Sequence, residues 1–222
     1  SQGPGQYLVV YTVNGGTPKA FGPNDPGCTQ SVFTFVNVIA TPTNLVCNDL
    51  VYVSLDADCT VDILPDDVLE GTYGCYDDYI VEIDKTFPIG NGPWTPATVN
   101  TGDIGKTYQV RVTHLVSGNK CWGNVTIEDK LEPVLSCENF TIPCNTPNLT
   151  PSYLKNTLNI AVAIPAFTDC QSVTLTYTDT ETDRDCASGF SKTINRKWIA
   201  VDASGNSSTC LQLINLRRPG VD

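Results

Sequence analysis

The chain of 222 residues is long enough for one large β domain or for two domains of immunoglobulin size. Hydrophobic residues make up 41% and charged residues only 17%, with 17 glycines and 15 prolines, which is typical of many short strands joined by turns rather than of a charged cytosolic enzyme. The net charge of −11 argues against nucleic-acid binding, which needs clustered lysine and arginine, and no apolar run is long enough to predict a membrane span.

The first β-rich segment lies at residues 7–13, YLVVYTV, which hold neither charge nor proline. An unpaired segment of this kind exposes backbone donors and acceptors and seeks a sheet edge. It can fold back as an ordinary first strand, or it can add to the sheet of a neighbouring copy. For the second outcome, the expected self-assembly residues are Tyr7, Leu8, Val9, Val10, Tyr11, Thr12 and Val13.

Further strands follow along the chain. Apolar and polar residues alternate cleanly in 108–113 and 122–128, so Val110, Val112, Val125 and Ile127 are expected to face a core. Other strands are expected at 31–39, 50–55, 61–64, 79–83, 159–164, 173–178, 193–201 and 210–216. Helix is limited to one turn after Pro65 and one or two turns at 151–156. The pattern predicts an all-β protein.

An internal repeat divides the chain. VRVTHLVSGNKCWGNVTIED (110–129) and KWIAVDASGNSSTCLQLINL (197–216) share a strand, a Ser-Gly-Asn turn, a cysteine and a second strand, with the turns 87 residues apart (117 to 204). The stretch TIEDKLEP (126–133) leaves the last strand of the first module and enters the second, and it is interpreted as a short charged linker rather than a site. We predict two tandem immunoglobulin-like β-sandwich modules, at 28–130 and 131–222, after an N-terminal extension with a strand at 1–27.

Ten cysteines, no CxxC pair and a single histidine favour disulfides in an oxidising compartment over zinc or iron–sulfur ligation. We therefore expect an extracellular or cell-surface protein that is stapled by disulfides. Each module holds four cysteines, and the last follows the Ser-Gly-Asn turn, which favours nested pairing although sequence alone does not fix it. The expected bridges are Cys47–Cys121, Cys59–Cys75, Cys144–Cys210 and Cys170–Cys186, with Cys28–Cys137 by elimination.

Several motifs resemble a known family. WIAVDASGNSSTC (198–210) and CENFTIPC (137–144) resemble the HYR (hyalin repeat) module, an immunoglobulin-like β-sandwich. CNDLVYVSLDADCTVDILPDDVLEG (47–71), GCYDDY (74–79) and CWGNVTIEDKLEP (121–133) are similar to repeats in long secreted proteins of filamentous Bacteroidota. The resemblance covers most of residues 45–219 and implies an adhesive or structural part of the cell surface.

Catalytic chemistry is not indicated. His114 stands at a predicted strand end without a GxSxG elbow, so we expect no enzyme. No cofactor is expected to be required, but Ca²⁺ could bind hard oxygen ligands at either of two acidic stretches. These candidate metal residues are Asp56, Asp58 and Asp62 in one stretch, and Glu128, Asp129 and Glu132 at the module junction. Sequons mark four candidate glycan-attachment residues, Asn124, Asn139, Asn148 and Asn206.

These observations favour a subunit of a self-assembling filament, sheath or fibre, whose partners are copies of itself. The alternative is a carbohydrate-binding or adhesin module that binds surface glycans. That alternative needs an exposed aromatic platform, for which Trp94 in the loop GNGPWTP is the candidate.

Overall fold

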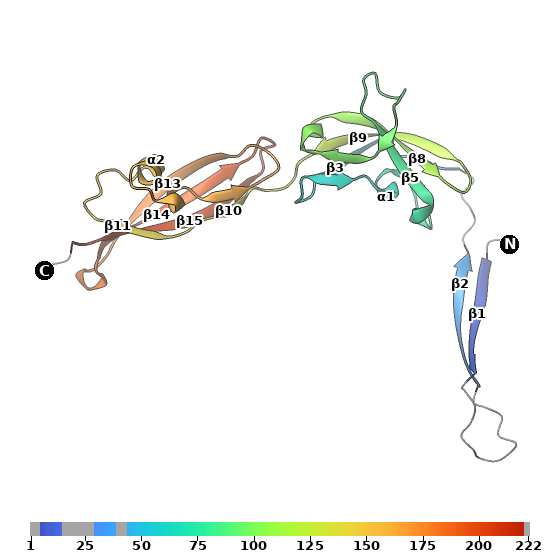
Figure 1. The fold of residues 1–222 in the computed structure, drawn as a ribbon, viewed down its shortest axis with the longest axis horizontal. Coiled ribbons are helices and arrows are strands. Elements are labelled where there is room, and N and C mark those ends of the chain that lie inside the picture. Colours follow the sequence, from blue (N-terminus) through green and yellow to red (C-terminus); the bar gives the residue numbers. More distant parts are fainter. Residues whose placement is uncertain (1–4, 15–28, 39–43, 220–222) are drawn as a thin grey trace, which may run out of the picture.

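The computed structural model describes residues 5–14, 29–38 and 44–219. These residues form an N-terminal hairpin and two sandwich-like modules that follow one another along the chain (Figure 1). Strands dominate both modules, so the predicted all-β, two-module, disulfide-stapled fold is confirmed. Among the described residues no helix is both long and apolar enough to cross a bilayer.

The hairpin consists of β1 (Gly5–Asn14) and β2 (Thr29–Val38), which pair antiparallel along their whole length. The predicted first module, at 28–130, includes residues 29–38. The structure instead gives β2 to the N-terminal unit, because its ten residues pair with β1. Neighbouring strands in the sequence commonly pair in this way.

Module 1 is built on a five-stranded sheet in the order β3-β9-β8-β5-β6, with β4 and β7 as a second, two-stranded sheet. Its elements are β3 (Leu50–Ser54), β4 (Thr60–Asp62), α1 (Pro65–Val68), the 3-10 turn η1 (Tyr76–Asp78), β5 (Tyr79–Asp84), β6 (Thr95–Pro96), β7 (Thr98–Asn100), the 3-10 turn η2 (Thr101–Asp103), β8 (Thr107–His114) and β9 (Lys120–Glu128). The predicted inward residues Val110, Val112, Val125 and Ile127 are fully buried. They pack with Val99, on β7, in one apolar core.

Module 2 has a four-stranded sheet in the order β11-β15-β14-β13 and a small sheet of β10 and β12. Its elements are β10 (Val134–Ser136), β11 (Phe140–Pro143), α2 (Pro151–Asn156), the 3-10 turn η3 (Ala161–Ala163), β12 (Ala166–Thr168), β13 (Thr174–Asp183), the 3-10 turn η4 (Cys186–Ser188), β14 (Phe190–Val201) and β15 (Ser207–Arg217). The strand expected at 159–164 is wrong. Asn159 adopts the left-handed region, with φ of 56°, and the 3-10 turn η3 follows it.

The two modules repeat one topology, as the sequence predicted. In each, the two longest strands, β8–β9 and β14–β15, flank a Ser-Gly-Asn turn, and an earlier strand, β3 or β11, adds parallel to the last one. The parallel partners lie at the same sequence offset, Leu50 with Asn124 and Phe140 with Ile214, which is 74 residues in both cases.

That parallel register explains two of the three disulfides found among the described residues. It places Cys47 beside Cys121 and Cys137 beside Cys210, so the first predicted bridge is confirmed. The predicted Cys144–Cys210 pair is wrong because Cys144 lies seven residues further along and bonds with its N–H to the Arg217 carbonyl instead.

The third disulfide joins Cys59 of module 1 to Cys170 of module 2, so the predicted pairs Cys59–Cys75 and Cys170–Cys186 are wrong. Within the part of the chain that the structure describes, Cys75 and Cys144 form no bridge. The predicted Cys28–Cys137 pair fails because Cys137 bonds Cys210, while Cys28 itself lies outside the described residues, as does the Cys186 side chain.

Candidate functional site

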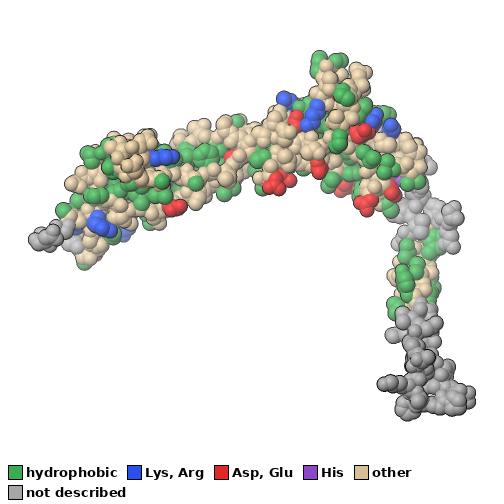
Figure 2. Space-filling model, viewed as in Figure 1, with side chains coloured by type: hydrophobic (Ala, Val, Ile, Leu, Met, Phe, Trp, Pro, Cys, Tyr) green, Lys and Arg blue, Asp and Glu red, His purple; other side chains and the backbone are tan. Residues whose placement is uncertain are grey.

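The N-terminal hairpin carries an exposed apolar face. Side chains alternate between the two faces of a strand, and the register places Leu8 opposite Phe35 and Val10 opposite Phe33 on one of them. Their exposed fractions are 54% and 61% for the first pair and 52% and 67% for the second. Figure 2 shows hydrophobic side chains gathered along the hairpin. A two-stranded hairpin is marginally stable alone in water, so burying this face against another surface would stabilise it.

The predicted self-assembly segment 7–13 therefore lies within β1. The exposed apolar face also needs residues of the partner strand β2. Tyr11, on the opposite face, is also exposed, while the side chains of Thr12 and Val13 lie outside the described residues. Phe33 and Phe35 are not among the predicted self-assembly residues. Their alternation in SVFTFV was visible, but nothing in it identified β1 as the partner strand.

Strand β13 leaves the sheet of module 2 with an open edge. It stands at the end of the strand order and pairs on one side with β14. It has ten residues, as many as β1 or β2. Beside it lies a cavity of about 560 Å³ whose apolar lining includes Leu175, Tyr177 and Trp198. An added strand would find both backbone partners and room for side chains at this edge.

The junction between the modules is bridged in three places. The Cys59–Cys170 disulfide links the loop after β3 to the segment after β12. Asn206 donates its side-chain N–H to the Asp129 carbonyl at 3.0 Å. Ser208 donates its hydroxyl to the Pro133 carbonyl. The linker predicted within 126–133 is thus held against module 2 at Asp129 and Pro133 and is not a free tether.

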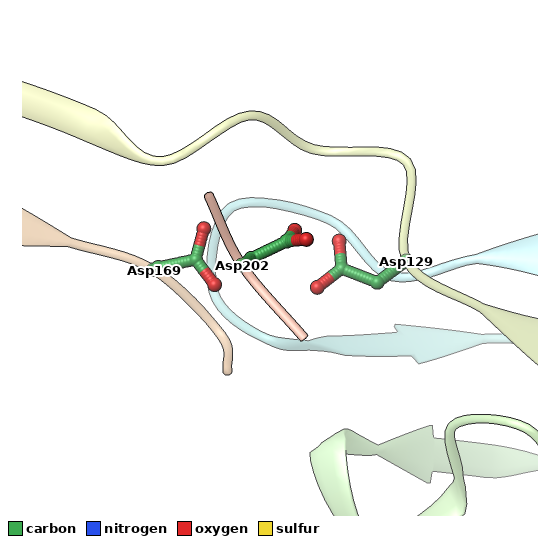
Figure 3. A group of neighbouring side chains, drawn as sticks. All are labelled: Asp129, Asp169 and Asp202. Atoms are coloured by element: carbon green, nitrogen blue, oxygen red, sulfur yellow. The ribbon is translucent and has the colours of Figure 1, made fainter. Parts of the chain in front are cut away.

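Three carboxylates meet at this junction. Asp129 follows β9 of module 1, Asp169 follows β12 and Asp202 follows β14. One oxygen of each lies within 4.8 Å of the others, and Figure 3 shows the side chains pointing toward one another. Asp129 is 3% exposed and Asp202 6%, while Asp169 is half-buried. An arrangement of buried hard oxygen atoms from separate segments is one that could hold a metal ion.

The carboxyl group of Asp169 is affected both by burial and by the neighbouring negative charges. Burial raises the pKa of its carboxyl, and the negative charges of Asp129 and Asp202 raise it further, against the hydrogen bond that the Gln171 N–H donates. Like charges held close together in a desolvated site favour the neutral form of the acid.

Of the predicted metal-binding residues that the following contacts describe, only Asp129 lies in the carboxylate cluster. Asp129 joins the cluster, whereas Glu128 forms an ion pair with Lys130 at 3.0 Å. Asp56 accepts the N–H of Asp58 and so caps its own loop. Asp62 accepts the hydroxyl of Thr98 on the paired strand β7. Among the described residues the structure does not gather Asp56, Asp58 and Asp62 into a group of acidic ligands.

The four sequons also differ in their surroundings. Asn206 and Asn124 use the side-chain nitrogen, the atom a glycan would occupy, as a donor, to the Asp129 and Asp49 carbonyls respectively. Asn139 and Asn148 are exposed, and the side-chain oxygen of each accepts a backbone N–H. Attachment at Asn206 would therefore break the junction contact.

One face of the Trp94 ring, the predicted aromatic platform, is covered by Arg111. The Arg111 guanidinium lies 4.4 Å from its ring centroid, and Arg111 also bonds Glu82 at 2.6 and 3.0 Å. Trp122, directly opposite Arg111 on β9, is 51% exposed and is the tryptophan that this face offers to solvent.

His114 packs inside module 1. It is 4% exposed, its ring lies 4.7 Å from the Tyr79 ring, and its Nδ1 bonds the Ser117 hydroxyl at 2.8 Å. These contacts fix the start of the Ser-Gly-Asn turn, so the histidine has a structural place at the strand end, where it was predicted.

No protein-family model matches the chain, and neither does any curated protein. Among solved structures, it is similar to human mucin-like protocadherin EC1-2, with a TM-score of 0.30 and 11% identity over 80% of this chain and 100% of that chain. Drosophila N-cadherin EC1-4 gives a TM-score of 0.28 at 10% identity, with 99% of this chain and 59% of that chain covered. An endo-fucoidan hydrolase of glycoside hydrolase family 107 gives 0.25 at 11% identity, with 98% and 42% covered. This chain thus spans about half the length of these last two structures, and likenesses of this size carry no conclusion about its activity.

Proposed function

We propose that this chain is a structural or adhesive extracellular protein whose copies assemble end to end into a filament, sheath or fibre. The observation that carries the proposal is the hairpin face of Leu8, Val10, Phe33 and Phe35, which leaves four large apolar side chains more than half exposed. The disulfides support an oxidising, extracellular setting. The resemblance of 198–210 to HYR modules supports the same setting.

A second copy of the chain is the occupant that fits this face. The hairpin and the open β13 edge have the same length, and they belong to opposite ends of the chain. The hairpin strands carry no charged residue, so docking would desolvate no charged side chain. If β1–β2 extends the sheet of module 2 in the next copy, its apolar face can cover the cavity beside Leu175 and Tyr177.

Such a contact is head-to-tail, because the donor surface and the acceptor surface differ. A heterologous contact that does not close into a ring generates an open filament. The backbone ladder supplies affinity, and the side chains that enter the cavity supply specificity.

The test compares two single-charge variants of adjacent hairpin residues in the full-length, disulfide-bonded protein. Phe35→Asp places a charge on the apolar face, and Thr34→Asp places the same charge on the opposite face. We expect Phe35→Asp to reduce polymer formation at least tenfold in sedimentation velocity and electron microscopy, with Thr34→Asp much less affected. If the unsubstituted protein stays monomeric at high concentration, or if Phe35→Asp assembles normally, the proposal is wrong.

The acceptor edge has its own pair of variants. Leu175 faces the cavity and Thr176 faces the other side of β13. We expect Leu175→Arg to block assembly and Thr176→Arg to permit it. Normal assembly of Leu175→Arg would reject β13 as the acceptor and leave the role of the hairpin in place.

A carbohydrate-binding module is the second candidate. Trp122 and Tyr52 are 51% and 63% exposed, and the parallel register of β3 and β9 puts them on one face of module 1. Aromatic faces of this kind stack against sugar rings. Retention of the protein on a glycan array, lost in Trp122→Ala, would support this candidate; equal retention of the variant would count against it.

A further inference from the structure

The carboxylate cluster at the module junction contains an acceptor without a partner. Asp129 Oδ2 is buried and makes no hydrogen bond among the described residues, although Asp129 is 3% exposed. In Figure 3 this side chain points toward Asp169 and Asp202. Burying a carboxylate oxygen without a donor is costly, and retaining it beside two further carboxylates is more costly still. A cation between the three would remove both costs.

No lysine or arginine side chain of the described residues supplies this positive charge. Within the described ranges none of the three carboxylates forms an ion pair with lysine or arginine, and nearby Lys130 pairs with Glu128. The negative charge of the cluster is therefore balanced by no side chain that the structure shows.

Backbone donors orient each carboxylate and leave capacity for a metal ion. The Leu131 N–H donates to Asp129 Oδ1 at 3.0 Å, and the Gln171 N–H donates to Asp169 Oδ1 at 2.7 Å. These bonds are the outer contacts that hold ligands in place around a metal, and they leave Oδ2 of Asp129 without a hydrogen-bond partner among the described residues.

The third ligand is oriented in the same way. Asp202 Oδ1 accepts the Asn206 N–H at 2.8 Å, and the Asn206 side chain bonds both Asp202 Oδ2 and the Asp129 carbonyl. Asn206 thus ties a module 2 ligand to a module 1 ligand directly.

We propose that Asp129, Asp169 and Asp202 bind a Ca²⁺ ion that joins module 1 to module 2. Three carboxylates supply hard oxygen ligands, and water completes the coordination shell. Ca²⁺ accepts six to eight oxygens in irregular geometry, whereas Mg²⁺ demands a tight octahedron, so a site divided between two modules favours Ca²⁺. The ion would stiffen the junction that the Cys59–Cys170 disulfide already spans.

The test uses the full-length, disulfide-bonded protein after treatment with a chelator. Calorimetric titration with CaCl₂ should show one site that Asp129→Asn weakens at least tenfold. Glu132→Gln removes a charge from the same linker without touching the cluster and should change the affinity less than twofold. In chelator, Asp129→Asn should unfold at the same temperature as the unsubstituted protein or higher, because the variant lacks the unpaired buried charge.

A second readout locates the ion. Ca²⁺ should slow tryptic cleavage after Lys130 in the unsubstituted protein and leave the rate unchanged in Asp129→Asn. Absence of binding at millimolar Ca²⁺, equal affinity in Asp129→Asn, or equal binding of Mg²⁺ would each overturn the proposal.

Discussion

At the scale of single residues, the interior of module 1 contains a polar network around Asp103 that no sequence pattern predicts. Asp103 is 7% exposed and accepts the Tyr108 hydroxyl at 2.7 Å, the Lys85 ammonium at 2.7 Å and the Asn100 N–H at 3.0 Å. The sequence indicated that Tyr108 points inward but could not supply its partner. A buried hydroxyl needs an acceptor, and which acceptor reaches it depends on the turn between β7 and β8.

This network has a consequence for pH. Burial raises the pKa of Tyr108 to about 12 from its ordinary value of 10.0, and the hydrogen bond to Asp103 adds to the rise. Because the folded-state pKa is the higher one, the contribution to stability is fully present below the ordinary pKa and is lost as pH rises through about 12.

We therefore predict a late-titrating tyrosine. Subtracting the alkaline absorbance titration of Tyr108→Phe from that of the unsubstituted protein should leave a single transition with a midpoint near 12. In Asp103→Asn the same transition should move to lower pH, because a neutral acceptor no longer repels the tyrosinate. A midpoint at the ordinary value of 10.0 in the unsubstituted protein would contradict the network.

At the scale of elements, the addition of β3 to β9 depends on a glycine. A Cβ atom on Gly123 would lie 2.3 Å from the Asn48 carbonyl oxygen and 3.7 Å from the Cys47 Cβ. The chain leading into β3 therefore approaches β9 more closely than any other residue at position 123 would allow. This contact also lies next to the Cys47–Cys121 bridge.

We predict that Gly123→Ala destabilises module 1 by about 1–3 kcal/mol, the usual cost of forcing an extra carbon into a packed contact. Lys120→Ala, at the exposed start of the same strand, should change stability by less than about 0.5 kcal/mol. Denaturant unfolding with the disulfides intact measures both. Equal stability of the two variants would show that β3 can move away without cost.

The elements also show which features of the fold could be predicted from the sequence and which could not. Strict alternation identified the buried faces of β8 and β9, and the two Ser-Gly-Asn turns identified the repeat, because both signals are local. Partner choice is not local, so the pairing of β2 with β1 was missed. The cluster was missed for the same reason: Asp129, Asp169 and Asp202 are 40 and 33 residues apart, and only Asp129 stood in a recognisably acidic stretch.

At the scale of the whole molecule, the decisive feature is the covalent link between modules. Pairing cysteines within each repeat was the simplest interpretation of two matching sets of four. Cys59 instead reaches Cys170, 111 residues away, because the loop after β3 and the segment after β12 meet at the junction. In the proposed filament, a junction fixed by this disulfide would transmit force between the modules, whereas a single short linker would act as a hinge.

The link can be tested by cutting the linker. Lys130 is well exposed, so brief trypsin treatment should cleave after it. Under non-denaturing, non-reducing conditions the two modules should stay together, and after denaturation they should still migrate as one species, because Cys59–Cys170 crosses the cut. Reduction should separate them.

The double variant Cys59→Ser/Cys170→Ser is the control. Its two fragments should separate under denaturing conditions without reduction, since Cys47–Cys121 and Cys137–Cys210 each lie on one side of the cut. If the fragments of the double variant remained joined, Cys59–Cys170 would not be the covalent link between the modules, and the rigid-junction interpretation would need a different basis.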